Sequence, residues 1–170
     1  QETGRLFMVS VLPTRPETGY GYIEPGKPLV TPAGVRAFDV GAFHEKPDIE
    51  TAHRYIDEGN FWNSGIFVWT ASAFLSEVKT VAPEIGDLLP LIDEESPEAF
   101  FAQVPNLTVD VAVLERSASV ASVEATFDWG DVGSWEGLTR RHEADPHGNV
   151  IVGPGHIVDG KRNVVYAEGG

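Results

Sequence analysis

The sequence predicts an α/β fold, and three observations support this prediction. Short runs of strand length, apolar or alternating, recur along the chain. Between them lie segments that begin with helix-capping residues. Hydrophobic residues make up 42% of the 170 residues and charged residues 22%, as in ordinary globular domains with a sizeable core. Because strands and helices alternate in sequence order, we expect an α/β arrangement.

The predicted strands are short and are bounded by turn residues. Residues 6–12 are an apolar run that ends at Pro13, and residues 13–21 have the composition of a loop. Residues 25–28, Pro-Gly-Lys-Pro, are expected to form a turn, and residues 29–34 the exposed end of a hairpin. The predicted strands, in chain order, are residues 6–12, 22–24, 35–40, 61–69 and 119–127.

The longer predicted helices begin at residues whose side chains can accept a hydrogen bond from the first turn. Asp48 is expected to cap a helix that runs to about Glu58 and ends at Gly59. The other capped helices begin at Thr70, Ser96 and Ser134, and shorter helices are expected at residues 83–85 and 109–117.

The chain changes character after Asp145-Pro146-His147-Gly148. Residues 149–152, 156–158 and 163–167 are short, strand-like stretches separated by glycine-containing segments. We therefore expect one domain over residues 1–147 and the start of a separate β-rich element over residues 148–170.

Charge and composition exclude several classes of function. The formal net charge of −14 would repel the phosphates of a nucleic acid, so nucleic acid is not an expected partner. No apolar run approaches the roughly 18 residues of a membrane span, so no membrane is expected either. The chain has no cysteine, which fits a cytoplasmic location. It also lacks a phosphate-binding loop, a dinucleotide-binding glycine motif and a hydrolase nucleophile motif.

Two polar clusters stand near predicted strands in the first third of the chain, and strand ends are where ligands bind in α/β sheets. In Gly19-Tyr20-Gly21-Tyr22, the glycines would let backbone groups approach a ligand closely, and a simple hairpin turn is the alternative. In Glu45-Lys46-Pro47, the carboxylate can hold sugar hydroxyls and the ammonium a phosphate. The alternative for this pair is a solvated ion pair.

Two further clusters lie later in the chain. Asn63 interrupts the most apolar strand, where an unsatisfied amide would cost about 1–3 kcal/mol, so Asn63 contacts either a ligand or a neighbouring loop. Asp128 and Asp131 are three residues apart, and carboxylates with that placement can hold Mg²⁺. We take Asp131 as the metal candidate and Asp128 as a turn or capping residue.

Four motifs indicate a protein family more specifically by their order and spacing than any one of them does alone. The motifs are Pro13-Thr14-Arg15-Pro16-Glu17-Thr18-Gly19-Tyr20-Gly21-Tyr22-Ile23, Phe43-His44-Glu45-Lys46-Pro47, Phe61-Trp62-Asn63-Ser64-Gly65-Ile66-Phe67 and Trp129-Gly130-Asp131-Val132-Gly133-Ser134-Trp135. Together they closely resemble the mannose-1-phosphate guanylyltransferases, a branch of the sugar nucleotidyltransferases. The resemblance extends over nearly the whole chain.

This resemblance implies a Rossmann-like, glycosyltransferase-A-like mixed sheet flanked by helices, followed by the start of a β-helix-like domain through which copies could associate. It implies GTP and mannose 1-phosphate as substrates, GDP-mannose as product and Mg²⁺ as cofactor. By the same resemblance, Tyr20 and Gly21 meet the sugar, Glu45 and Asn63 bind it, Lys46 binds its phosphate and Asp131 binds the metal.

The family's glycine-rich GTP-binding signature does not occur in this chain. We therefore expect the chain to correspond to the second, sugar-binding half of the catalytic domain and to be inactive alone. A glucose-1-phosphate nucleotidyltransferase and a non-catalytic regulatory subunit that binds a nucleotide sugar remain alternatives. A carbohydrate-binding module is disfavoured, because Lys46 and Asp131 suit phosphate and metal rather than neutral glycan.

Overall fold

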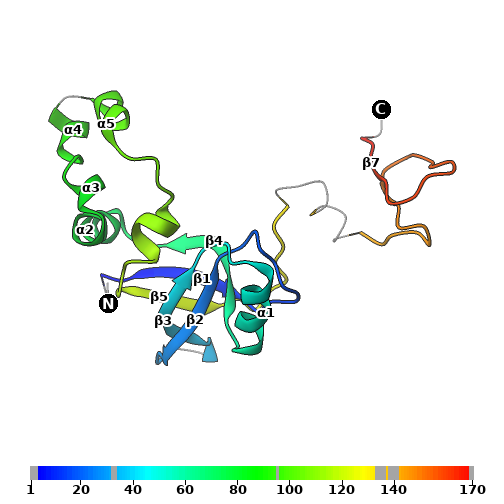
Figure 1. Ribbon diagram of the computed structural model, residues 1–170, viewed down its shortest axis with the longest axis horizontal. Helices are drawn as coiled ribbons and strands as arrows, with labels where there is room; N and C mark the ends of the chain where they lie inside the picture. Colours follow the sequence, from blue (N-terminus) through cyan, green and yellow to red (C-terminus); the bar gives the residue numbers. More distant parts are fainter. Residues whose placement is uncertain (1–3, 32–33, 95, 133–136, 138–141, 169–170) are drawn as a thin grey trace. The chain divides into compact units, whose positions relative to one another are not determined.

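The computed structural model describes residues 4–31, 34–94, 96–132, 137 and 142–168 (Figure 1). The chain divides into two compact units, Gln1–Phe127 and Asp128–Gly170, which are described separately. The predicted domain boundary at residues 147 and 148 stays a prediction.

The first unit is built around five strands that close into a barrel. The strands are β1 (Leu6–Val11), β2 (Tyr22–Pro28), β3 (Ala37–His44), β4 (Phe61–Val68) and β5 (Val120–Glu124). Their order around the barrel is β1-β4-β2-β3-β5. Strand β5 closes it, pairing parallel with β1 and antiparallel with β3. The sheet is therefore mixed, as expected, while its closure was not predicted.

The barrel encloses an apolar core that follows from the alternation of side chains along each strand. Leu6 and Met8 of β1 are fully buried, and the residues between and after them, Phe7 and Val9, are only partly so. Phe38 of β3 meets Phe61 of β4 with ring centroids 5.0 Å apart. Full burial of each such side chain contributes roughly 1.5–3 kcal/mol.

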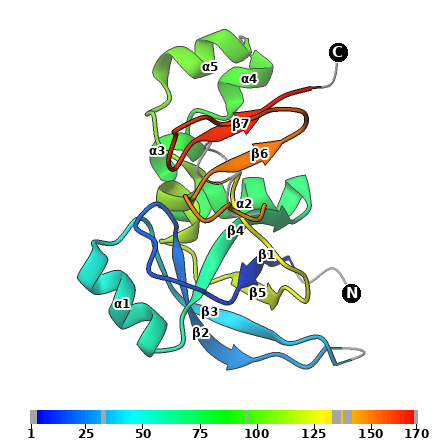
Figure 2. The same cartoon turned by 90° about the vertical axis from the view of Figure 1, so that its right-hand side faces the viewer.

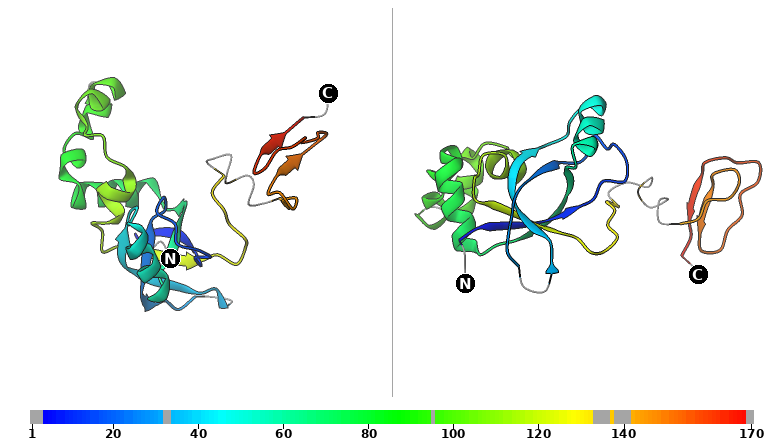
Figure 3. Two further views of the ribbon diagram at one scale, coloured as in Figure 1. Left: turned by 45° about the vertical axis from the view of Figure 1, so that its right-hand side comes forward. Right: turned by 90° about the horizontal axis from the view of Figure 1, so that it is seen from below.

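Three of the helices start at the predicted capping residues Asp48, Thr70 and Ser96. The helices are α1 (Ile49–Asp57), α2 (Ala71–Val81), α3 (Pro83–Gly86), α4 (Pro90–Glu94) and α5 (Pro97–Gln103), followed by a π-helical turn, η2 (Asp110–Leu114). The Asp48 side chain accepts from the Thr51 N–H at 2.8 Å, and Thr70 and Ser96 cap α2 and α5 in the same way. Figure 3 shows α1 on a different side of the barrel from the group α2 to α5.

Two local predictions were wrong. Residues 25–28 extend β2 instead of forming a turn, and β2 and β3 run on together as a hairpin (Figure 2). Proline is tolerated there because β2 pairs with β4 only at Tyr22 and Ile23, so beyond them it is an edge strand with register shifts. In the second unit, residues 156–158 form no strand.

The second unit contains a small parallel sheet. Strand β6 (Val150–Val152) pairs with β7 (Val164–Tyr166). Asn149, which is 3% exposed, joins the two strands because its Oδ1 accepts from the Asn163 N–H at 3.0 Å. The predicted helix capped by Ser134 falls mainly on residues 134–136 and 138–141, outside the described residues, and the β-helix-like continuation stays a prediction.

Within the described ranges, no helix has both the length and the apolar character needed to cross a membrane.

Candidate functional site

Three of the four polar clusters meet at one place in the first unit. Strand β2 lies between β3 and β4, and Tyr22 pairs with His44 on one side and Trp62 on the other. In antiparallel pairing, the residue before Tyr22 therefore lies beside the residues after His44 and Trp62. The register thus brings Gly21, Glu45 and Asn63 together, and the Asn63 N–H donates to the Gly21 carbonyl oxygen at 2.8 Å.

Gly21 is fitted to this site by its lack of a side chain. A Cβ at Gly21 would lie 2.7 Å from Glu45 Oε2, 3.0 Å from Phe43 Cζ and 3.3 Å from Asn63 Cβ. A Cβ at Gly19 would meet only Glu17 Oε1, at 3.6 Å. A larger residue at Gly21 would therefore displace the Glu45 carboxylate, which is the free end of a flexible side chain, and would crowd Phe43.

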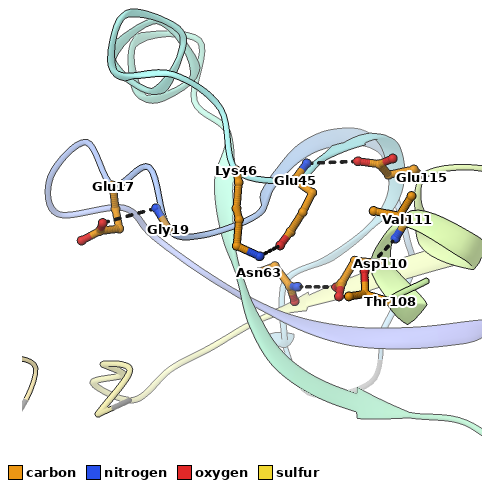
Figure 4. Close-up of polar contacts among 9 residues, drawn as sticks. All are labelled: Glu17, Gly19, Glu45, Lys46, Asn63, Thr108, Asp110, Val111 and Glu115. Carbon is orange, nitrogen blue, oxygen red and sulfur yellow. Dashed lines mark hydrogen bonds and ion pairs between the residues drawn. The ribbon is translucent and has the colours of Figure 1, made fainter. Parts of the chain in front are cut away.

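Glu45 lies beside Gly21 and forms an ion pair with Lys46. Figure 4 shows this pair. Lys46 Nζ lies 2.6 Å from Glu45 Oε1, and the Lys46 side chain is 61% exposed against 18% for Glu45. The hydrogen bond that Lys46 donates to Glu45 and the negative charge of Glu45 raise the pKa of Lys46, with a smaller contribution from Asp110. The ammonium stays protonated and reaches solvent, so it can also meet an anionic ligand.

The Asn63 carboxamide has one partner at each end. Its Oδ1 accepts from the Gly65 N–H at 2.9 Å. Its Nδ2 donates to Asp110 Oδ1 at 3.1 Å, as Figure 4 shows. A carboxamide offers two N–H donors and two oxygen lone pairs. Among the contacts of the described residues, one donor and one lone pair of Asn63 remain for a ligand, so the loop-contact alternative and the ligand-binding hypothesis are compatible.

Two site residues were missed by the sequence analysis, and they lie at the two ends of η2. Asp110 meets Asn63, and Glu115 Oε1 accepts from the Glu45 N–H at 3.2 Å. The Glu115 N–H donates to the Asp110 carbonyl oxygen, a bond between residues five apart that defines a π-helical turn. These residues lie one turn apart and so face the same site, whereas α-helical spacing would place them on different faces. An Asp five residues before a Glu was the only signal in the sequence.

The site is rich in hydrogen-bond acceptors. Glu45, Asp110 and Glu115 contribute three carboxyl groups, and the Lys46 ammonium stands beside them. Burial raises the pKa of Asp110, the nearby Glu45 charge raises it further, and Lys46 and Asn63 act against this. Such a set suits a ligand with several hydroxyl donors and one anionic group directed at Lys46.

Aromatic side chains support the loop that carries Gly21. Tyr20 packs edge-on against Trp62 with ring centroids 5.1 Å apart, and the Arg15 guanidinium carbon lies 5.1 Å from the Trp62 ring centroid. The Tyr22 hydroxyl accepts from the Glu17 N–H at 3.0 Å. These contacts hold residues 15–22 against β4, and Tyr20 lies in the chain directly beside Gly21.

The fourth cluster belongs to the second unit. Asp128 and Asp131 are both exposed there, and Gly133, Ser134 and Trp135 lie outside the described residues. Among the residues the structure describes, no group of three or more His, Asp or Glu side chains is arranged to hold a metal ion. Binding of Mg²⁺ by Asp131 stays a prediction.

Comparison with known proteins identifies relatives of the chain. A family model described as nucleotidyl transferase matches residues 1–147. The chain is 38% identical over 176 aligned positions to mannose-1-phosphate guanylyltransferase of Salmonella muenchen, and 37% identical over 182 to that of Escherichia coli K12. These alignments cover 97% and 99% of this chain but 36% and 37% of the relatives, so the chain spans about a third of their length.

A solved structure extends the likeness to the fold. The crystal structure described as mannose-1-phosphate geranyltransferase from Thermus thermophilus matches with a TM-score of 0.82 and 35% identity. The match covers 98% of this chain and 49% of that chain. The similarity therefore includes both the sequence and the arrangement of its elements.

Proposed function

We propose, because this chain belongs to the nucleotidyl transferase family, that it carries the mannose 1-phosphate site of an enzyme that forms GDP-mannose. The observation that carries the proposal is the convergence of Glu45, Lys46 and Asn63 around Gly21. The guanylyltransferase names of the relatives support this choice of substrate.

Each residue has a role that follows from its chemistry. Glu45 accepts hydrogen bonds from sugar hydroxyls, and Asn63 supplies one further donor and one further acceptor. Lys46 binds the phosphate of the sugar phosphate, exchanging part of its contact with Glu45 for the ligand's charge. Tyr20 and Gly21 form the adjacent wall of the site.

The reaction joins this phosphate to a nucleotide. An oxygen of mannose 1-phosphate attacks the α-phosphorus of GTP, the bond from that phosphorus to the bridging oxygen of the β-phosphate breaks, and pyrophosphate leaves. The attacking oxygen is already anionic, so no general base is needed, and the protein contributes positioning and charge neutralisation. Lys46 holds the attacking phosphate in place during this step.

In this proposal Asp131 would hold a Mg²⁺ ion. The carboxylate of Asp131 is a hard oxygen donor on an exposed residue, which fits Mg²⁺. Bound there, Mg²⁺ would supply neutralisation of the phosphate charges. Because the chain spans about a third of its curated relatives, we assign the GTP-binding residues to sequence outside it.

The test is pyrophosphate release by the full-length protein that contains this chain. Release should require GTP, mannose 1-phosphate and Mg²⁺ together, and glucose 1-phosphate should replace mannose 1-phosphate poorly. Asn63→Ala should weaken the response to mannose 1-phosphate, and Asn106→Ala, at an exposed loop position, should not. Binding of GDP-mannose without pyrophosphate release would contradict the catalytic role and indicate a regulatory subunit.

A further inference from the structure

The orientation of the Asn63 side chain is set by two partners of opposite polarity. The Gly65 N–H can only donate to the amide oxygen, and the ionised Asp110 carboxylate can only accept from the amide nitrogen. The two ends of a carboxamide have nearly the same shape, so contacts of this kind decide which end faces which way. In this structure the Asn63 amide is therefore held in one orientation.

The two partners differ in strength. The bond from Gly65 is exposed, so water competes for it, while the bond to Asp110 is partly buried. A hydrogen bond to an ionised acceptor is roughly twice as strong as one between neutral groups. Asp110 is thus the stronger of the two anchors on Asn63.

Asp110 is itself held by the core of the first unit. It begins η2, whose residues Ala112, Val113 and Leu114 are at most 2% exposed. The other end of the same turn leads into Glu115, which accepts from the Glu45 N–H. One buried π-helical turn therefore connects the core to both Glu45 and Asn63.

We propose that Asp110 is a positioning residue for sugar binding. Its carboxylate fixes the Asn63 carboxamide so that one N–H and one oxygen lone pair are presented to the ligand in a set order. The donor and the acceptor that Asn63 offers to a sugar hydroxyl are then already in position before the ligand binds. Binding therefore carries no free-energy cost for reorienting the amide. The identity of the ligand rests on the proposed function, whereas the control of Asn63 by Asp110 does not.

The first experiment is a double-mutant cycle on mannose 1-phosphate affinity, measured by calorimetry on the full-length protein. Asp110→Ala should weaken binding about 10-fold, since it removes a charge-assisted hydrogen bond. Asn63→Ala should cost at least as much, and the double variant no more than Asn63→Ala alone. Asp110→Asn keeps an acceptor oxygen and should bind within about threefold of the wild type. Additive losses, or no loss in Asp110→Ala, would overturn the proposal.

The second experiment needs no ligand. The side-chain NH₂ resonances of Asn63, assigned by their loss in Asn63→Ala, should shift in Asp110→Ala and shift by a smaller amount in Asp110→Asn, where the acceptor is kept but is neutral. Asp57→Asn, at the exposed end of α1, controls for the loss of one negative charge and should leave them in place. Unaltered Asn63 resonances in a folded Asp110→Ala protein would overturn the positioning role.

The two experiments separate the two proposals. If Asp110→Ala shifts the Asn63 resonances but the wild-type protein does not bind mannose 1-phosphate, the control of Asn63 is supported and the choice of ligand is wrong. If the wild type binds and the cycle is additive, the proposed ligand is supported and the positioning role is wrong. Should Asp110→Ala fail to fold, Asp110→Asn and Asn63→Ala still decide, because a bond to Asp110 predicts a shifted Asn63 resonance when the acceptor becomes neutral.

Discussion

The Cβ position of Gly21 lies 2.7 Å from Oε2 of Glu45, closer than two unbonded heavy atoms of this kind can approach. Gly21 and Glu45 are thus fitted to one another across the β2–β3 pairing. A Cβ there would also crowd Phe43 of the core and Asn63 of the site, at 3.0 and 3.3 Å.

Gly21→Ala should weaken mannose 1-phosphate binding and destabilise the first unit. The added methyl group overpacks the space between Glu45 and Phe43, which we expect to lower the free energy of unfolding by about 1–3 kcal/mol. Calorimetric binding and thermal unfolding would measure the two effects. Gly19→Ala is the matched control, because a Cβ there has an ordinary contact with Glu17. Equal behaviour of the two variants would contradict the close fit.

Glu45→Ala should weaken the binding of the sugar, and Lys46→Ala should weaken the binding of its phosphate. Loss of the Glu45 carboxylate should weaken mannose 1-phosphate binding about 10- to 100-fold, because hydrogen bonds to a charged group are lost. Lys46→Ala should weaken the binding of mannose 1-phosphate. The binding of free mannose, which has no phosphate, should be unchanged when it is measured by saturation-transfer NMR. Lys27→Ala, on exposed β2, should change neither. Loss of the mannose signal in Lys46→Ala would contradict an action of Lys46 through the phosphate alone.

The pKa of Lys46 should depend on Glu45. The hydrogen bond and charge of Glu45 raise the pKa of Lys46 above its ordinary value of 10.5. A raised pKa in the folded state means that the stabilisation is complete below the ordinary pKa and is lost as the pH rises through the raised value. The ¹³Cε resonance of Lys46 should therefore titrate at lower pH in Glu45→Gln than in the wild type. An unchanged midpoint would mean that the ion pair does not persist in solution.

Asp145 should stabilise the turn that begins the small sheet of the second unit. Its Oδ1 accepts from the His147 and Asn149 N–H groups at 2.9 and 2.8 Å, and its Oδ2 accepts from Asn149 Nδ2 at 2.9 Å. These bonds, led by that from the Asn149 side chain, lower the pKa of Asp145. Their stabilisation is present above the ordinary pKa of 3.8 and is lost as the pH falls through the lowered one.

Asp145→Ala should accordingly lower the protection of the β6 and β7 amides against hydrogen exchange, relative to the intrinsic exchange rate at the same pH, and acidification should have the same effect on the wild type. The amides of β1 in the first unit serve as the internal reference. Faster exchange in β1 as well would indicate a general loss of structure rather than loss of the Asp145 turn.

Local sequence signals predicted the parts of the fold that depend on neighbouring residues. Asp48, Thr70 and Ser96 cap helices as expected, because a cap is a hydrogen bond between residues three apart. The prolines of β2 misled the prediction, because their effect depends on whether a neighbouring strand needs their N–H groups. No window of the sequence contains that information.

The sequence by itself determined the chemistry of the candidate site, since Gly21, Glu45, Lys46 and Asn63 could be named from their motifs and family resemblance. Only the tertiary structure decided that β2 lies between β3 and β4, which brings these residues together. It also decided that Asp110 and Glu115 face them, because a π-helical turn, stabilised by burial in the core, aligns residues five apart. Motif chemistry is carried by residue type and order, whereas proximity is set by strand pairing and packing between segments far apart in the chain.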